Sequence, residues 1–486
     1  MHRSTSGASP HQASGESFMT RTLITNSTLV TMDDEHGILP VGDLLIEDGR
    51  IAAIGTDLAS SIDRSSCEVI DGTNLIAIPG LINAHIHMWQ TAVRGFGVDW
   101  TGIEHHFHMQ TEFVPVYTPD DIRASEYFGA LNLINGGITT VYEWCHGNRT
   151  PDHSDAAIDG LDKSGIRAKF IHGTVKTLPQ PGQPHFSEIP HPREEAIRLR
   201  RLHSSDDARI TLALGFLGPE YSPIEVCRQD FQLAHELGIW SSAHAHGRPG
   251  KVPGGYVGLA KEGLLKGRHN GVHLNSAKDE ELLALLDNGC SITATSQTEI
   301  GSGGREPLIR RVQELGGAPS IGTDSEANTS ADMLECMRWS LIIQRLFNNI
   351  EKARKETVEA PASTNAVSRD KPLPPRINPG SYDALYWATM GNAKAFGLDH
   401  RIGSLTVGKS ADITLIRRTG VNLAPAINPV DAIVSFANPS NVDTVMVEGR
   451  VLKRNGVLVE QAAAERAAVD LRRRAERVIA ESGARI

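Results

Sequence analysis

The spacing of hydrophobic and polar positions differs between the ends of the chain and its middle. In residues 22–78, short apolar segments alternate with turn residues such as Asp48 and Gly49, as is typical of β-strands joined by hairpins. Similar segments recur in residues 399–458, where Glu448-Gly449-Arg450 repeats the pattern of Asp48-Gly49-Arg50. We therefore expect the two ends to fold together into one small β-sandwich.

Between these ends, an apolar segment followed by an amphipathic helix is repeated along residues 79–398. This alternation is the pattern of a parallel sheet with helices outside it, and eight such strands in series favour a closed barrel. The sequence therefore predicts an α/β protein built on a (β/α)₈ TIM-like barrel. The expected strands are 81–87, 139–146, 167–174, 210–219, 239–246, 271–275, 291–297 and 319–325.

Three further segments lie outside this scheme. Residues 1–21 are polar and lack the hydrophobicity to order themselves, so we expect a disordered leader. Residues 350–380 are rich in proline and charge without a clear period, which indicates an irregular insertion in the barrel. Residues 459–486 have helical periodicity and predict a C-terminal helix.

Composition restricts the possible partners and the compartment. With 486 residues, 40% of them hydrophobic, the chain can form a large core and a smaller accessory domain. No apolar run approaches the ~20 residues that span a bilayer, and the net charge of −10 disfavours binding to nucleic acid. Five scattered cysteines without a CxxC pair predict no disulfide framework. A cytoplasmic protein that binds neither membranes nor nucleic acid is expected.

The sharpest chemical signal is the pair His85 and His87. Alternate residues of a strand point to the same face, so two imidazoles separated by one residue can bind the same cation. Such a pair also occurs by chance, but suitable ligands end three later strands: His244, His273 and Asp324. Barrel strands place their functional side chains at the C-terminal mouth, where these residues would converge.

The predicted ligand set is His85, His87, His244 and Asp324. Three imidazoles and one carboxylate suit one divalent ion, Zn²⁺ or alternatively Fe²⁺, and leave a position for a reactive water. Asp324 is then the expected acceptor of the water's proton, and His273 would polarise the scissile group or stabilise the developing oxyanion. Both are predicted to be catalytic.

Together with its flanking motifs, this ligand pattern resembles that of the amidohydrolase superfamily, in the branch of triazine hydrolases and S-adenosylhomocysteine deaminases. The motifs are PGLINAHIHMWQTAVRG from residue 79, the strand-end residues His244 and His273, GTDSEAN from residue 322, and NAKAFGLDHRIGSLTVGKSADITLI from residue 392. The resemblance runs from Thr22 to Val457. It implies a metal-dependent hydrolase acting on a small-molecule substrate, assembled as a homodimer or homotetramer.

One position departs from this branch. The resemblance leads us to expect a glutamate three residues after His244, where it would pass a proton to a departing amine, but Gly247 stands there. The proton would then come from His273, Asp324 or His246. We therefore expect hydrolysis of an amide, lactam or amidine-type C–N bond in a small cyclic substrate. A dehalogenating hydrolase, an aminohydrolase of a heterocycle, and a decarboxylase or lyase remain alternatives.

Five residues are predicted to contact the substrate. Trp89 and Gln90 directly follow the first barrel strand, Trp100 lies in the segment after it, and Glu220 follows the fourth strand. His246 lies two residues after His244 and could equally be a fifth ligand or support the ligands from behind. For Trp89 the alternative is that its ring caps the barrel core.

Overall fold

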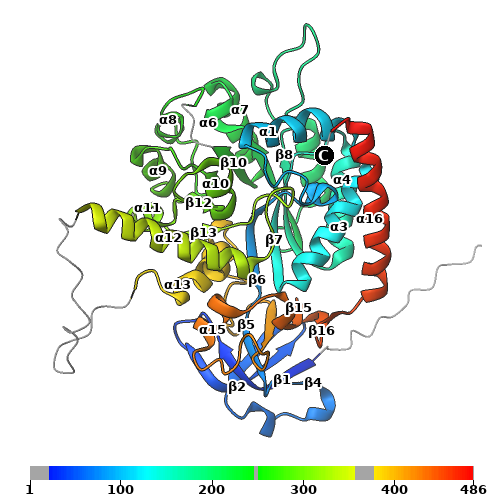
Figure 1. The fold of residues 1–486 in the computed structure, drawn as a ribbon, viewed down its shortest axis with the longest axis vertical. Coiled ribbons are helices and arrows are strands. Elements are labelled where there is room, and N and C mark those ends of the chain that lie inside the picture. Colours follow the sequence, from blue (N-terminus) through cyan, green and yellow to red (C-terminus); the bar gives the residue numbers. More distant parts are fainter. Residues whose placement is uncertain (1–20, 246–249, 356–376, 485–486) are drawn as a thin grey trace, which may run out of the picture.

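The computed structural model describes residues 21–245, 250–355 and 377–484. Within these ranges the strands form two sheets, an eight-stranded parallel one and a nine-stranded mixed one. Figure 1 shows the parallel sheet and its helices above the mixed sheet, which both ends of the chain build. The predicted α/β fold, a barrel with a β domain formed from both ends of the chain, is confirmed.

The barrel strands follow one another around the parallel sheet in chain order, from β6 to β13. Their side chains alternate between the barrel interior and the surrounding helices, so an interior cluster that includes Ile82, Trp144 and Ile171 fills the barrel. The strands are β6 (Leu81–Ile86), β7 (Ile138–Cys145), β8 (Arg167–Gly173), β9 (Ile210–Phe216), β10 (Trp240–Ala245), β11 (His269–His273), β12 (Ser291–Ala294) and β13 (Ser320–Ile321).

A helix follows each barrel strand and packs outside it. Helix boundaries are set locally: Thr118 and the N3 residue Asp121 form a capping box at the start of α3, and Gly165 and Gly238 end α4 and α7 in the left-handed conformation. The helices are α3 (Pro119–Asn135), α4 (Pro151–Ser164), α5 (Arg193–Leu202), α7 (Ile224–Leu237), α8 (Gly255–Lys261), α9 (Asp279–Leu286), α11 (Ile309–Glu314) and α12 (Met333–Lys355).

The barrel closes where the segment after β13 meets β6. The backbone N–H of Asp324 donates to the carbonyl of His85 over 2.9 Å, and the N–H of His87 donates to the carbonyl of Asp324 over 2.7 Å. Gly322 is required for this approach, because a Cβ atom there would lie 2.6 Å from the backbone nitrogen of His85. Closure therefore brings Asp324 beside His85 and His87.

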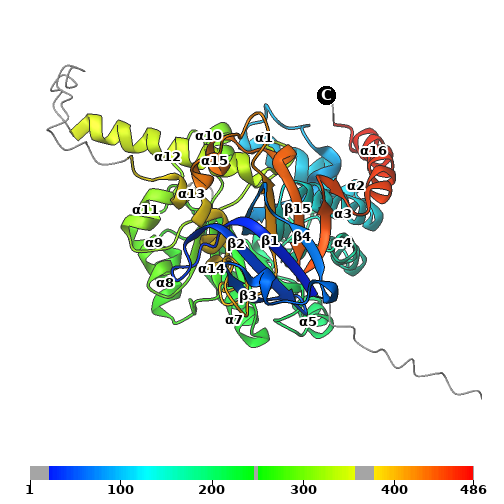
Figure 2. The ribbon, with the colours of Figure 1, turned by 90° about the horizontal axis from the view of Figure 1, so that it is seen from below.

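The terminal strands form one hydrogen-bonded mixed sheet rather than two separate sheets (Figure 2). Strand β1 pairs with β2 on one side and, along successive parts of its other side, with β4 and then β5, which keeps the sheet continuous. Its strands are β1 (Arg21–Val30), β2 (Ile38–Glu47), β3 (Arg50–Gly55), β4 (Glu68–Asp71), β5 (Leu75–Pro79), β14 (Ile413–Arg417), β15 (Val442–Val447), β16 (Arg450–Arg454) and β17 (Val457–Leu458).

The remaining predicted segments are only partly described. Residues 1–20 of the predicted leader and residues 356–376 of the predicted insertion lie outside the described residues, whereas α12 continues helically to Lys355. The C-terminal helix α16 (Gln461–Ser482) runs beside α3 in Figure 1, and Arg474 and Arg477 on it form ion pairs with the buried Asp121 of α3. Among the described helices, none combines the length and apolar character needed to cross a membrane.

A buried ion pair joins the bottom of the barrel to the mixed sheet, and its removal should destabilise the protein. Arg167 of β8 contacts the Asp412 carboxylate through Nε at 2.7 Å and Nη2 at 3.0 Å, and both side chains are buried. Asp412→Asn should lower the free energy of unfolding by about 3 kcal/mol, because it removes the buried carboxylate and leaves the guanidinium only the partly exposed Glu448, 3.0 Å from Nη2. Urea denaturation measures this change.

The matched control is the exposed pair Arg209 and Asp162 on the barrel surface. Its atoms lie 2.5 Å apart, but 66% of the Asp162 side chain is accessible to solvent, so Asp162→Asn should cost less than about 1 kcal/mol. Equal losses for Asp412→Asn and Asp162→Asn would contradict the role of Arg167 as a buried link between the two sheets.

Candidate metal centre

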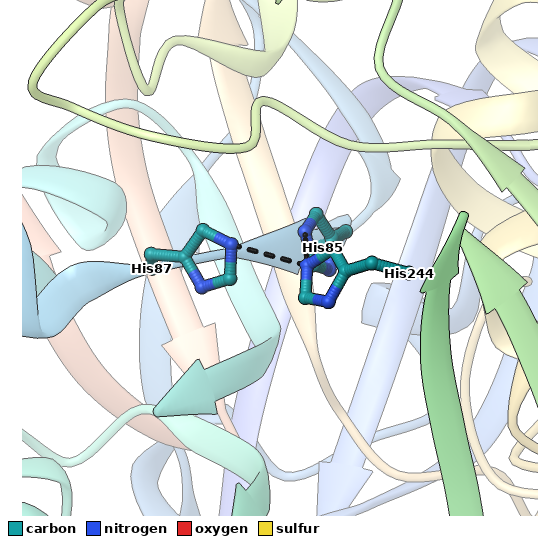
Figure 3. A group of neighbouring side chains, drawn as sticks. All are labelled: His85, His87 and His244. Atoms are coloured by element: carbon teal, nitrogen blue, oxygen red, sulfur yellow. Dashed lines mark hydrogen bonds between the residues drawn. The ribbon is translucent and has the colours of Figure 1, made fainter. Parts of the chain in front are cut away.

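The predicted ligands come from strands on different sides of the barrel and meet at its C-terminal mouth. His85 lies in β6, His87 directly follows β6, His244 lies in β10, and Asp324 follows β13. His85 and His87 direct their rings to the same site, as expected for alternate residues at the end of a strand. Figure 3 shows the three imidazoles turned toward one another.

The four candidate donor atoms lie at separations that suit one small cation. His244 Nε2 is 3.2 Å from both His85 Nε2 and His87 Nε2, as the dashed lines of Figure 3 mark. Asp324 Oδ1 is 3.3 Å from His85 Nε2 and 3.5 Å from His87 Nε2. Ligands at ~2.1 Å from a tetrahedral zinc ion are roughly 3.4 Å apart. The residues therefore fit a single divalent ion.

The protonation of these groups also suits a cation. His87 Nδ1 lies 2.6 Å from the carbonyl oxygen of Trp144 and donates to it, which leaves the Nε2 lone pair directed at the site. Burial, and then the neighbouring imidazoles, hold the pKa of His87 and of His244 well below the ordinary value. Burial alone would raise the pKa of Asp324, but its hydrogen bond with His85 and the nearby imidazoles leave it well lowered. Three neutral imidazoles and one carboxylate result.

His273 lies beside this cluster but is held by a different partner. It is the last residue of β11, and its Nδ1 lies 3.2 Å from Oε1 of Glu299 and 3.0 Å from the hydroxyl of Thr295. Glu299 belongs to α10 (Ser296–Gly303), which begins directly after Thr295. This carboxylate orients the His273 ring, a role that we did not predict from the sequence.

The backbone is unusual at both residues that we predicted to be catalytic. His273 and Asp324 have φ angles of 68°, in the left-handed region that non-glycine residues seldom adopt. Such a conformation costs on the order of 1–3 kcal/mol and persists where the surrounding contacts hold it. At Asp324 the contacts are the closing hydrogen bonds with His85 and His87.

A cavity of about 540 Å³ opens over the cluster. This volume is in the range of small-molecule sites, which are concave and offer a few polar groups to the ligand. Cavity-lining residues that carry polar or charged side chains include His87, His105, His106, Gln110, His146, Lys176, Glu220, His244, His273, Asn275, Glu299, Arg305 and Asp324.

Comparison with known proteins places this architecture in a family. The chain is 28% identical over 475 residues to a 5-methylthioadenosine/S-adenosylhomocysteine deaminase of Desulforamulus reducens, covering 95% of this chain and 99% of that protein. It is also 28% identical to a 5'-deoxyadenosine deaminase of Methanothermobacter thermautotrophicus, covering 86% and 90% of the two chains. Residues 76–452 match the model of the amidohydrolase family. The chain belongs to the amidohydrolase family.

Solved structures share the amidohydrolase fold seen here. A triazine hydrolase variant superposes with a TM-score of 0.78 at 23% identity, covering 93% of this chain and 98% of that one. A zinc-bound adenosine deaminase from Xanthomonas campestris gives a TM-score of 0.76 at 20% identity, covering 94% and 99%. At these identities the likeness establishes the fold alone.

Within this amidohydrolase, one of the predicted substrate contacts lines the cavity. Glu220 does so from α6 (Gly218–Tyr221), which directly follows β9. His246, and with it Gly247, lies outside the described residues.

Three other predicted substrate contacts, Trp89, Gln90 and Trp100, are not among the residues that line this cavity. After His87 the chain enters a 3₁₀ helix whose first N–H, that of Met88, donates to Glu143 over 2.6 Å, and Trp89 and Gln90 turn into the fully buried interior. Trp100 instead stacks on His108, with ring centroids 4.4 Å apart.

Trp89 nevertheless acts on the cavity through another residue. Its indole N–H donates to His146 Nδ1 over 3.0 Å, and His146, which follows β7, lines the cavity. Because Nδ1 accepts this bond, the proton of the neutral His146 ring is on Nε2. The pair thus offers the cavity a hydrogen-bond donor with a fixed tautomer.

Proposed function

We propose that this amidohydrolase is a zinc-dependent aminohydrolase that releases an amino group from a small nitrogen heterocycle. The observation that carries the proposal is the convergence of His85, His87, His244 and Asp324 within 3.5 Å of their nearest partners, under a cavity of small-molecule size. The relatives named as deaminases of adenosine derivatives, together with the triazine hydrolase and the zinc-bound adenosine deaminase among solved structures, support this substrate class.

The zinc ion, when bound, supplies Lewis-acid activation of a water molecule at neutral pH. Asp324 is buried, ionised and adjacent to the ligands, so its carboxylate accepts the proton that the attacking water loses. Because the backbone of Asp324 is fixed by hydrogen bonds to His85 and His87, this base is held in place before substrate arrives.

His273 is suited to protonate the leaving nitrogen. Burial alone would lower its pKa, but the hydrogen bond to Glu299 and the charges of Asp324, Glu299 and Glu220 outweigh burial, so its pKa is raised. An imidazolium at this cavity wall can donate to the ring nitrogen or amine on which negative charge develops. In this proposal His273 replaces the glutamate whose expected position is Gly247.

The test is ammonia release by the zinc-loaded protein. Adenosine, 5'-deoxyadenosine, aminated triazines and aminopyrimidines are incubated in water enriched in oxygen-18, with Asp324→Asn as the inactive control. The expected result is ammonia from at least one heterocycle, with one labelled oxygen in the product, and neither with the variant.

Two outcomes would contradict the proposal. With a chlorinated aminotriazine among the triazines tested, label in the product with chloride rather than ammonia as the leaving group would assign a dehalogenating hydrolase to the same site. Turnover without incorporated label would assign a decarboxylase or lyase, because only hydrolysis transfers oxygen from water to the product.

A further inference from the structure

The cavity contains a buried lysine that the proposed hydrolysis does not use. Lys176 follows β8 by three residues, only 5% of it is accessible to solvent, and it lines the same cavity as His87 and His244. Its ammonium nitrogen lies 4.8 Å from the centroid of the Tyr221 ring, and its backbone N–H donates to the buried side chain of Gln110. The Gln110 amide thus holds the backbone of Lys176, and the Tyr221 ring contacts its ammonium at the cavity wall.

Among the described residues, no countercharge is in contact with this ammonium. No carboxylate of the described residues lies within 4.0 Å of Lys176 Nζ. Two carboxylates of the cavity contact histidines instead: Glu299 pairs with His273, and Asp324 pairs with His85. Glu220 acts on Lys176 only from beyond ion-pair distance. Buried cations in proteins are ordinarily paired, because an isolated charge loses its hydration without compensation.

A second cation lines the same cavity. Arg305, in the segment after α10, likewise has no carboxylate within 4.0 Å in the parts of the chain that the structure describes. Burial lowers the pKa of Lys176 to about 8, so it still carries its proton at neutral pH. The cavity therefore presents positive charge for which the described residues supply no contacting partner.

We propose that Lys176 binds a carboxylate group of the substrate, so that the heterocycle processed by this enzyme carries an anionic substituent. This inference rests on the proposed function and adds the substrate class. A single carboxylate is favoured over a phosphate, because a dianion would meet greater repulsion from the nearby Glu220. The subsite is close to the metal ligands, since the charge of Lys176 acts on His146 and His244.

The experiment compares two ligands that differ in one group. 6-Aminonicotinate and 6-aminonicotinamide are titrated calorimetrically into the zinc-loaded wild-type protein and into Lys176→Gln. The wild type should prefer the carboxylate, and K176Q should weaken carboxylate binding by about 10- to 100-fold, as expected when a charged hydrogen bond is lost. Binding of the carboxamide should change less than about twofold, because it makes no ion pair with Lys176.

Two further variants control this comparison. Lys163→Gln removes an exposed lysine that pairs with Asp159, and it should change neither affinity. Lys176→Arg retains the charge and should keep the preference for the carboxylate, which guards against a misfolded K176Q. The melting temperature of K176Q without ligand should not fall below that of the wild type, because the substitution removes an unpaired buried charge.

The outcomes separate this inference from the proposed function. A carboxylate preference that survives K176Q would mean that the metal or Arg305 holds the carboxylate, and it would overturn the inference. Equal affinity of the wild type for both ligands would overturn it as well. If the preference depends on Lys176 while no heterocycle releases ammonia, the proposed hydrolysis fails and the carboxylate site stands.

Discussion

Replacement of His85 by alanine is expected to remove the bound metal and the activity together. The His85 imidazole is completely buried, and its Nε2 lies 3.2 Å from His244 Nε2 and 3.3 Å from Asp324 Oδ1. Without it, the ion loses one of its four protein ligands, and His244 and Asp324 lose their contact with the His85 ring, so the remaining ligands bind metal much more weakly. Metal content should fall from one ion per chain to almost none, and kcat/KM by at least about 10⁴-fold.

Elemental analysis after dialysis and the zinc dependence of thermal unfolding measure this effect. Zinc should raise the melting temperature of the wild type and leave that of His85→Ala unchanged, because only the folded wild type binds the ion. His36→Ala is the control, since His36 belongs to the partly exposed group with Asp33 and Glu35 near the start of the chain. Retention of one zinc ion by His85→Ala would refute the proposed centre.

The convergence of the four proposed metal ligands could be predicted from the sequence because a simple geometric rule governs it. Residues at the C-terminal ends of parallel barrel strands must converge, and the period of two in a strand places residues 85 and 87 on one face. Neither rule requires knowledge of distant contacts. The same reasoning placed Glu220 at the mouth, because it lies directly after a barrel strand, and the cavity contains it.

The residues around the ligands depended on contacts that the sequence does not display. Trp89 is only two positions beyond His87, yet the turn that Glu143 holds directs its ring behind His146 instead of into the cavity. Glu299 reaches His273 from a helix 26 positions later in the chain. A separation of 26 residues matches neither the period of a strand nor that of a helix, so the sequence does not indicate that His273 and Glu299 are in contact. The contact depends on how β11 and α10 are arranged in the fold.

The mixed sheet shows a similar limit. The repeated turn at Asp48 and Glu448 indicated that the two ends fold together, and Gly449 does pack against Gly49, where an added Cβ would lie 3.0 Å from the Gly49 Cα. That these strands form one continuous sheet could not be predicted, because it depends on how β1 pairs along one edge with both β4 and β5. Local patterns give the strands but not their partners.

Replacement of His273 is expected to reduce the rate while leaving the metal bound. His273 Nδ1 contacts Glu299 and Thr295, and the four proposed metal ligands already lie within 3.5 Å of their nearest partners. His273→Gln should therefore lower kcat by about 10²- to 10⁴-fold, the usual contribution of a general acid, with zinc content near one per chain. Loss of zinc in proportion to activity would instead identify His273 as a ligand.

Glu299→Gln tests how that acid is tuned. Because the Glu299 carboxylate helps to raise the pKa of His273, the amide should lower that pKa, and the protonated form should be lost at a lower pH. The falling limb of the kcat profile at high pH should move toward acid, with a loss of about tenfold at neutral pH. Glu314→Gln, on the surface beside Arg310, should leave the profile unchanged. A profile that stays in place in Glu299→Gln would contradict this tuning and would show that the carboxylate only positions the His273 ring.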